Sequence, residues 1–189
     1  MNPFFTEDKI EAGCDEAGRG CISGPVVAAA VILPKDCILP SLNDSKQLSA
    51  KKRQQLVPLI KEMALSYSVA FIDQVRIDEI NILNASFEAM HKAVDGLNQK
   101  PELLLIDGNR FNPYPEIPHE CIVKGDAKFL SIAAASVLAK EARDEFMQNI
   151  HKEHPEYDWQ KNMGYPTKAH KAAVLQYGAT KYHRKTFKL

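Results

Sequence analysis

Two adjacent carboxylates near the N-terminus, Asp15 and Glu16, stand just before the glycine-rich turn Gly18-Arg19-Gly20. Consecutive side chains of an extended strand point to opposite faces, so we expect the strand to end here and to leave both acids at its rim. Glycines permit positive φ and close backbone approach, and the arginine adds a cation with amide donors beside it. The motif suits a divalent cation together with a phosphate, although an ordinary surface turn with solvated acids would have the same residues.

Two further predicted strands run into an acid beside a glycine. Residues 103–106 lead to Asp107-Gly108, and residues 121–123 lead to Lys124-Gly125-Asp126. Polar sites of open α/β sheets collect at the carboxyl ends of strands, where loops bring distant residues together. Several carboxylates in one place repel one another unless cations neutralise them, and an all-oxygen set favours Mg²⁺ or Mn²⁺ over zinc. Because two such ions can clamp the attacking and leaving oxygens of a phosphodiester, we interpret the strand ends as one metal site. Acids that end strands only for solubility are the alternative.

The hydrophobic patterns indicate which elements position these acids. Strands and helices alternate along the chain, which favours an α/β domain with a mixed sheet, and no interior linker divides residues 1–189. The expected strands span residues 9–15, 22–33, 67–72, 103–106 and 121–123, and the expected helices span 50–65, 73–97, 129–151 and 169–176. Ser49 is a good N-cap for the first helix, whereas Pro58 conflicts with that helix. The second helix should form in two pieces and end at Gly96.

Charge and cysteine content narrow the class of protein. The formal net charge is zero, but residues 46–61 and 165–189 contain basic side chains and no acid. Such segments predict a face for polyanions, or else two solvated basic faces. The four cysteines have no metal-ligand spacing. We see neither a signal peptide nor an apolar run long enough to span a membrane, so we expect a cytoplasmic protein without membrane contact.

A set of short motifs, in one order along the chain, resembles bacterial ribonuclease HII, the type 2 ribonuclease H. Each motif alone is weak, but the ordered set is specific and covers essentially the whole chain. Cys21 is a mild departure, since the family often has proline there. The motifs are Asp15-Glu16-Ala17-Gly18-Arg19-Gly20, Asn43-Asp44-Ser45-Lys46, Leu105-Ile106-Asp107-Gly108-Asn109-Arg110, Lys124-Gly125-Asp126, Ser131-Ile132-Ala133-Ala134-Ala135-Ser136-Val137-Leu138-Ala139-Lys140, Ala142-Arg143-Asp144 and Gly164-Tyr165-Pro166-Thr167.

The resemblance implies a fold and an activity. The fold would be a ribonuclease-H-like mixed β-sheet flanked by helices, with a short helical C-terminal segment, about residues 155–189, that contacts substrate. The activity would be a metal-dependent endoribonuclease that hydrolyses the RNA strand of RNA–DNA hybrids. It would also nick duplex DNA 5′ of embedded ribonucleotides, using two Mn²⁺ or Mg²⁺ ions and leaving 3′-hydroxyl and 5′-phosphate ends. We expect a monomer whose partners are these nucleic acids. The alternatives are a resolvase- or transposase-like nuclease of the same fold, or a non-catalytic nucleic-acid-binding module.

The resemblance also assigns residues. It makes Asp15, Glu16, Asp107 and Asp126 the catalytic, metal-binding acids. Gly18-Arg19-Gly20 would read the 2′-hydroxyl, the group that distinguishes RNA from DNA, and Tyr165 would stack on the neighbouring sugar. Asp144 competes with Asp126 for the fourth position, and Glu16 could use its backbone carbonyl instead of its carboxylate. Basic residues would follow phosphates without reading sequence; these are Lys46, Lys51, Lys52, Arg53, Lys168, Lys171 and Arg184. We expect His170 and His183 to be phosphate or surface contacts.

Overall fold

A five-stranded mixed sheet forms the centre of the computed structural model, which describes residues 1–39, 42 and 49–188. The strands lie in the order β3-β2-β1-β4-β5. Strands β1, β2 and β3 pair antiparallel, whereas β4 pairs parallel with both β1 and β5. Their bounds are Glu11–Ala17 for β1, Val26–Ile32 for β2, Ser66–Ile72 for β3, Leu103–Asp107 for β4 and His119–Ile122 for β5. The expected α/β class with a mixed sheet is confirmed.

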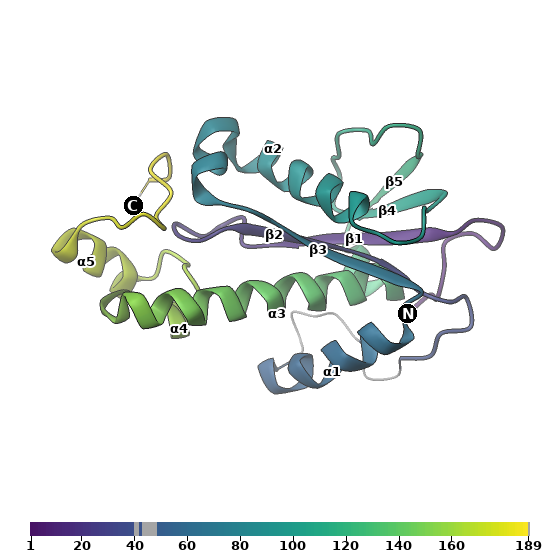
Figure 1. The fold of residues 1–189 in the computed structure, drawn as a ribbon, viewed down its shortest axis with the longest axis horizontal. Helices are drawn as coiled ribbons and strands as arrows, with labels where there is room; N and C mark the ends of the chain where they lie inside the picture. Colours follow the sequence, from purple (N-terminus) through teal and green to yellow (C-terminus); the bar gives the residue numbers. More distant parts are fainter. Residues whose placement is uncertain (40–41, 43–48, 189) are drawn as a thin grey trace.

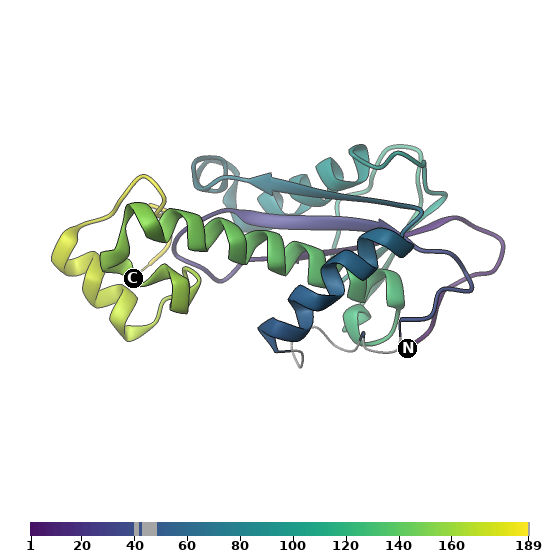
Figure 2. The same ribbon diagram turned by 60° about the horizontal axis from the view of Figure 1, so that its bottom comes forward.

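Helices cover both faces of the sheet. Figure 1 shows α2 (Gln74–Asp95) on one face, and α1 (Ala50–Met63) with α3 (Leu130–Glu153) on the other. Turning the molecule brings α1 in front of α3, against which it packs (Figure 2). The short helices α4 (Trp159–Asn162) and α5 (Lys168–Tyr177) lie at one end, beyond the sheet. Across the described residues, no helix combines the length and the apolar character that a membrane span needs.

Strand β2 shows why the sheet is buried on both sides. Its seven residues are all apolar and all buried. Val26, Ala28 and Ala30 belong to the core cluster that includes α2, while Ala29 and Val31 belong to the cluster with α1 and α3. This alternation is the period of two that a pleated strand imposes, and it makes β2 a central strand between two helical layers.

Helix α3 lies unusually close to strand β1. A Cβ on Gly13 would stand 2.3 Å from the backbone nitrogen of Ile132, so only glycine allows this approach. The facing helix is rich in alanine, including Ala133, Ala134 and Ala135, all of which are fully buried. The close contact brings the next turns of α3 alongside the end of β1, where the acids stand.

Helix boundaries agree with the local signals in the sequence. The Ser49 hydroxyl accepts a hydrogen bond from the Lys52 nitrogen at 3.4 Å, and α1 continues through Pro58. Helix α2 is interrupted at Asn81, where φ is 66°, and Gly96 caps its end. The two-piece helix and its end at Gly96 are therefore confirmed.

Candidate active site

Strand β1 ends at Ala17, directly before the glycine-rich turn as expected, but two residues beyond the expected last residue Asp15. Its ladder with β2 pairs Asp15 with Ala29 and Glu16 with Ala28. The pairing to β2 holds the chain extended past both acids, and they project to opposite faces as in any strand. They nevertheless line one cavity, because β4 ends at Asp107, next to Asp15 in the parallel register, and the corner of the sheet is open there.

This cavity brings most of the predicted site together. Its volume is about 460 Å³. It is lined by three acids, the glycine-rich turn, the predicted stacking tyrosine, two basic side chains from the helices and a serine. The lining residues are Asp15, Glu16, Ala17, Gly18, Arg19, Gly20, Arg53, Asp107, Ser136, Lys140 and Tyr165. Lys46 lies outside the described residues, so its predicted contact with substrate stays a prediction.

The carboxylates are crowded. Asp15 is 5% exposed, and its Oδ1 accepts a hydrogen bond from the Glu16 nitrogen at 2.7 Å. Burial, followed by the negative charges of Glu16 and Asp107, raises the pKa of Asp15 well above its ordinary value, although a hydrogen bond from Ser136 acts in the other direction. A site in which anions disfavour one another in this way is stabilised by a bound cation.

Each neighbouring carboxylate is held by a local contact. Asp107 Oδ1 accepts from the Gly125 nitrogen at 2.7 Å, and Glu16 Oε1 lies 3.2 Å from Arg19 Nη1. The Gly125 contact ties the end of β4 to the turn Gly125–Ala127, which carries Asp126. Asp126 is 2% exposed. The fourth predicted acid is thus anchored beside Asp107, although it does not line the cavity wall.

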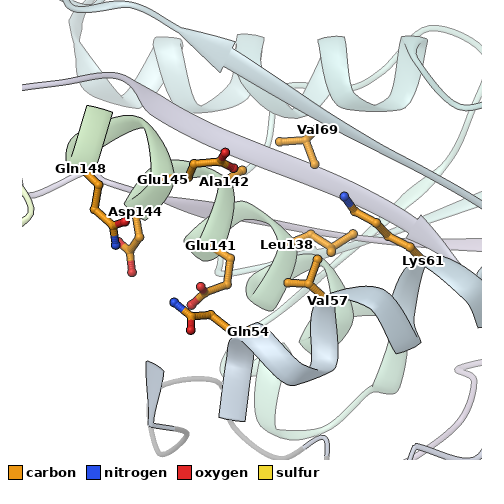
Figure 3. A pocket seen from close by; sticks show the side chains of 10 residues that line it. All are labelled: Gln54, Val57, Lys61, Val69, Leu138, Glu141, Ala142, Asp144, Glu145 and Gln148. Atoms are coloured by element: carbon orange, nitrogen blue, oxygen red, sulfur yellow. The ribbon is translucent and has the colours of Figure 1, made fainter. Parts of the chain in front are cut away.

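Asp144, the competitor for the fourth position, has different neighbours. It pairs with Lys140 and lies 3.4 Å from Arg53 Nη2. It lines a separate hollow between α1 and α3, together with Gln54, Glu141 and Gln148 (Figure 3). Asp144 is thus a counter-ion to two basic side chains, and the choice of Asp126 as the fourth metal-binding acid stays a prediction.

Arg53 and Lys140 bring positive charge from α1 and α3 to the cavity wall. Arg53 Nε donates to Glu141 Oε1 at 2.7 Å, and Asp144 faces both basic side chains. Arg53 was predicted to follow phosphates, whereas Lys140 and Ser136 were given no role. The sequence could have indicated both residues, because Ser136, Lys140 and Asp144 are spaced four residues apart and therefore share one face of the helix.

Three residues that we predicted at the surface are buried. His170 is fully buried, His183 is 4% exposed, and Arg184 is 2% exposed. The prediction that Arg184 follows phosphates is wrong, because its guanidinium donates to backbone carbonyls inside the protein. The surface role expected for His170 and His183 is wrong for the same reason: their ring nitrogens are engaged in buried hydrogen bonds.

The donor set fits divalent metal ions that prefer oxygen. Carboxylates of Asp15, Glu16 and Asp107 meet at one cavity, and hard cations such as Mg²⁺ and Mn²⁺ take such ligands. Over residues 1–39, 42 and 49–188, no three acidic, histidine or cysteine side chains already converge as a ligand cluster. One carboxylate oxygen of Glu16 contacts Arg19, and one of Asp107 contacts Gly125, so these two oxygens are engaged in contacts within the protein.

The mixed sheet carries acids at the ends of β1 and β4 and has helices on both faces. This combination of fold and site is that of a nuclease of the ribonuclease H class. The family model of ribonuclease HII matches residues 12–189. Ribonuclease HII of Bacteroides thetaiotaomicron is 60% identical over 187 residues, which are 99% of this chain and 94% of that protein. The chain belongs to the ribonuclease HII family. It is a ribonuclease H hydrolase, and this family depends on divalent metal.

Solved structures agree with this assignment. Ribonuclease H2 from Pyrococcus horikoshii OT3 superposes with a TM-score of 0.78 at 27% identity, covering 94% of this chain and 93% of that one. Ribonuclease HII in the PCNA complex from Archaeoglobus fulgidus gives 0.79 at 26% identity, covering 95% and 96%. The ribonuclease-H-like fold is confirmed, and the resolvase-like and non-catalytic alternatives are excluded by family membership.

Proposed function

We propose that this chain cuts the RNA strand of RNA–DNA hybrids and nicks duplex DNA on the 5′ side of a single embedded ribonucleotide. The products would carry 3′-hydroxyl and 5′-phosphate ends. One observation supports the proposal above the others: a single cavity is lined by three of the four acids, by the Gly18-Arg19-Gly20 turn and by Tyr165. A group that can hydrolyse a phosphodiester and a group that can recognise a ribose thus stand side by side.

The acids Asp15, Glu16, Asp107 and Asp126 would hold two divalent ions, Mg²⁺ or Mn²⁺. Such ions, when bound, lower the pKa of water and offset the charge on the leaving oxygen. The chain's own part is to gather the carboxylates at one corner of the sheet, with Asp15 buried against α3. Glu16 lines the cavity, and we expect it to take part through its carboxylate.

Substrate would be held from both sides of the cavity. Arg53 and Lys140 line its wall and would contact phosphates beside the scissile bond. Tyr165 is 45% exposed at the rim, so its ring is available to stack on a sugar or base. Lys168 and Lys171 on α5, and Lys51 and Lys52 on α1, would follow the backbone further out.

The chain would act as a monomer in the cytoplasm, as one domain. The segment from about residue 155 to the C-terminus packs into the body through His183 and Arg184, which supports a single domain. All four cysteines are free, as in a reducing compartment.

The test is Asp107→Asn, assayed on an RNA–DNA hybrid with Mg²⁺ or Mn²⁺. We expect loss of cleavage by a factor of about 10² or more, because a metal-binding carboxylate is removed, while binding of the hybrid in chelator is retained. Asp36→Asn, at an exposed acid away from the cavity, is the matched control and should cut like the parent. An active Asp107→Asn enzyme would refute the metal mechanism.

A further inference from the structure

Three backbone segments meet behind the cavity. The loop of residues 18–25 carries the glycine-rich turn, residues 163–165 carry the tyrosine, and residues 180–187 belong to the C-terminal segment. The Gly24 nitrogen donates to the Tyr182 carbonyl at 2.8 Å, and the Arg184 nitrogen donates to the Ile22 carbonyl at 2.9 Å. The Ile22 nitrogen in turn donates to the Gly164 carbonyl at 2.9 Å. The C-terminal segment therefore pairs with one loop, and that loop with the other.

The Arg184 guanidinium fixes the orientation of the glycine-rich turn. It is 2% exposed and donates to the carbonyls of Gly18 at 2.8 Å and of Arg19 at 3.1 Å. In a trans peptide the carbonyl and the following N–H point in opposite directions. Holding these two carbonyls on Arg184 therefore turns the N–H groups of Arg19 and Gly20 away from it, and both of these residues line the cavity.

A second buried arginine, Arg143, supports the same loop from α3. It is 1% exposed and donates to the carbonyls of Ser23, Pro25 and Met163. Within the described chain neither guanidinium has an ion pair with a carboxylate, so carbonyl dipoles balance the buried charges. Burial lowers the pKa of Arg184 to about 10, which still leaves it charged at neutral pH. A carbonyl bound to a cation polarises its peptide and strengthens the N–H on the other side as a donor.

His183, the residue before Arg184, is linked through His170 to the loop that carries Tyr165. His183 Nδ1 accepts from the Thr180 nitrogen at 2.9 Å, so its proton is on Nε2, which lies 3.3 Å from His170 Nε2. His170 Nε2 also accepts from Trp159 Nε1 at 3.0 Å. The proton of His170 is therefore on Nδ1, where it donates to the Tyr165 carbonyl at 2.9 Å. Two neutral imidazoles thus connect His183 to the backbone of the tyrosine.

We propose that His183 and Arg184 are positioning residues that set the turn of residues 18–20 and Tyr165 at a fixed separation, and so determine selectivity for a lone ribonucleotide. The inference rests on the proposed function of the turn and of Tyr165. Neither positioning residue touches substrate: Arg184 acts through the peptides of the turn, and His183 acts through His170. The C-terminal segment is then required for reading the substrate, in addition to its packing role.

Single ribonucleotides and long hybrids should differ in their sensitivity to this arrangement. In a duplex with one ribonucleotide, a single register places the 2′-hydroxyl at the turn. On a long hybrid every register presents a 2′-hydroxyl at the turn. A turn that is less firmly positioned can therefore still contact a 2′-hydroxyl on this substrate. Loss of positioning should therefore lower kcat/KM far more on the single ribonucleotide than on the hybrid.

The test compares Arg184→Lys with Arg76→Lys, the same change at an exposed arginine on α2. The Arg184 guanidinium also donates from Nε to the Gly24 carbonyl at 3.0 Å, and lysine, although it keeps the charge, cannot reach three carbonyls with a planar fork. We expect Arg184→Lys to lower kcat/KM roughly 10- to 100-fold on a single-ribonucleotide duplex and far less on a long hybrid, with an unchanged Mg²⁺ concentration for half-maximal activity. Equal losses on both substrates, or no loss, would overturn the proposal.

Two variants of His170 provide a second test in case the Arg184 variants do not fold. His170→Asn retains an amide donor where Nδ1 lies, whereas His170→Leu has none. Asn should preserve the ratio of the two kcat/KM values and Leu should reduce it, so equal ratios in the two variants would overturn the proposal. If the parent enzyme itself fails to nick at a single ribonucleotide, the proposed function fails; if it nicks and the variants keep its selectivity, only the positioning role fails.

Discussion

Replacing Gly13 with alanine tests how the close approach of α3 builds the site. The new Cβ would lie 2.3 Å from both Ile132 N and Ser131 C, and 2.6 Å from Ser131 O. Ordinary carbon contacts are about 3.5–4.0 Å, so the helix must retreat by roughly 1 Å or more. All three atoms belong to the backbone, so no side chain can rotate to relieve the clash.

The expected loss of stability follows from overpacking between two rigid elements. Such changes destabilise by about 1–3 kcal/mol, and occasionally by more. At about 2–4 °C per kcal/mol for a chain of this size, Tm should fall by roughly 2–12 °C. Because Ser136 and Lys140 on α3 line the cavity, activity on an RNA–DNA hybrid should also fall at temperatures where the variant is fully folded.

Urea unfolding, and cleavage at a temperature well below both Tm values, are the measurements. Gly178→Ala is the comparison, because its new methyl would meet no atom within 4 Å, although its φ of 85° carries a backbone penalty. It should lose some stability and no activity. A Gly13→Ala protein within about 0.5 kcal/mol of the parent, the scatter of ordinary surface substitutions, would refute the reasoning that α3 rests on this glycine.

Three further predictions follow from the site. Burial holds the pKa of His183 at about 4 in the folded protein against an ordinary 6.5, so the unfolded chain binds this proton first as pH falls. The free energy of unfolding should therefore decline by about 1–3 kcal/mol between pH 6.5 and pH 4. In urea unfolding at several pH values, His183→Gln should show a smaller decline over this range. Asp144→Asn should weaken hybrid binding and destabilise by about 1–3 kcal/mol, since Arg53 and Lys140 lose a partner, yet retain metal-dependent cleavage, whereas Asp126→Asn should abolish cleavage; the reverse result would exchange the two roles. Tyr165→Ala should reduce cleavage at a single ribonucleotide more than cleavage of a long hybrid, and equal losses in paired kcat/KM measurements would contradict its role in reading the junction.

The sheet and the acids could be predicted because their signals are local. Strand β2 is an unbroken apolar run, and Asp107 directly follows four large aliphatic residues. Asn81 interrupts α2 at a φ of 66°, a conformation that asparagine adopts more readily than most residues. Where the determinant lies in the residue's own type, or in its immediate neighbours, the sequence is informative.

The true end of β1 and the buried cations could not be predicted in the same way. Strand β1 continues through Glu16 because β2 offers ladder partners there, a fact of pairing between strands. Arg184 looks like one more cation in a basic tail, but folding places its guanidinium among carbonyls from residues some 160 positions away. No periodicity reports such contacts, since backbone carbonyls are the same at every position.

The most direct test of the account is to map the cut in a labelled DNA duplex that contains one ribonucleotide. With Mg²⁺ or Mn²⁺ we expect a single nick immediately 5′ of the ribonucleotide, with 3′-hydroxyl and 5′-phosphate ends, and no cut in the all-DNA duplex. Equal cutting of the all-DNA duplex would contradict recognition of the 2′-hydroxyl by the Gly18-Arg19-Gly20 turn.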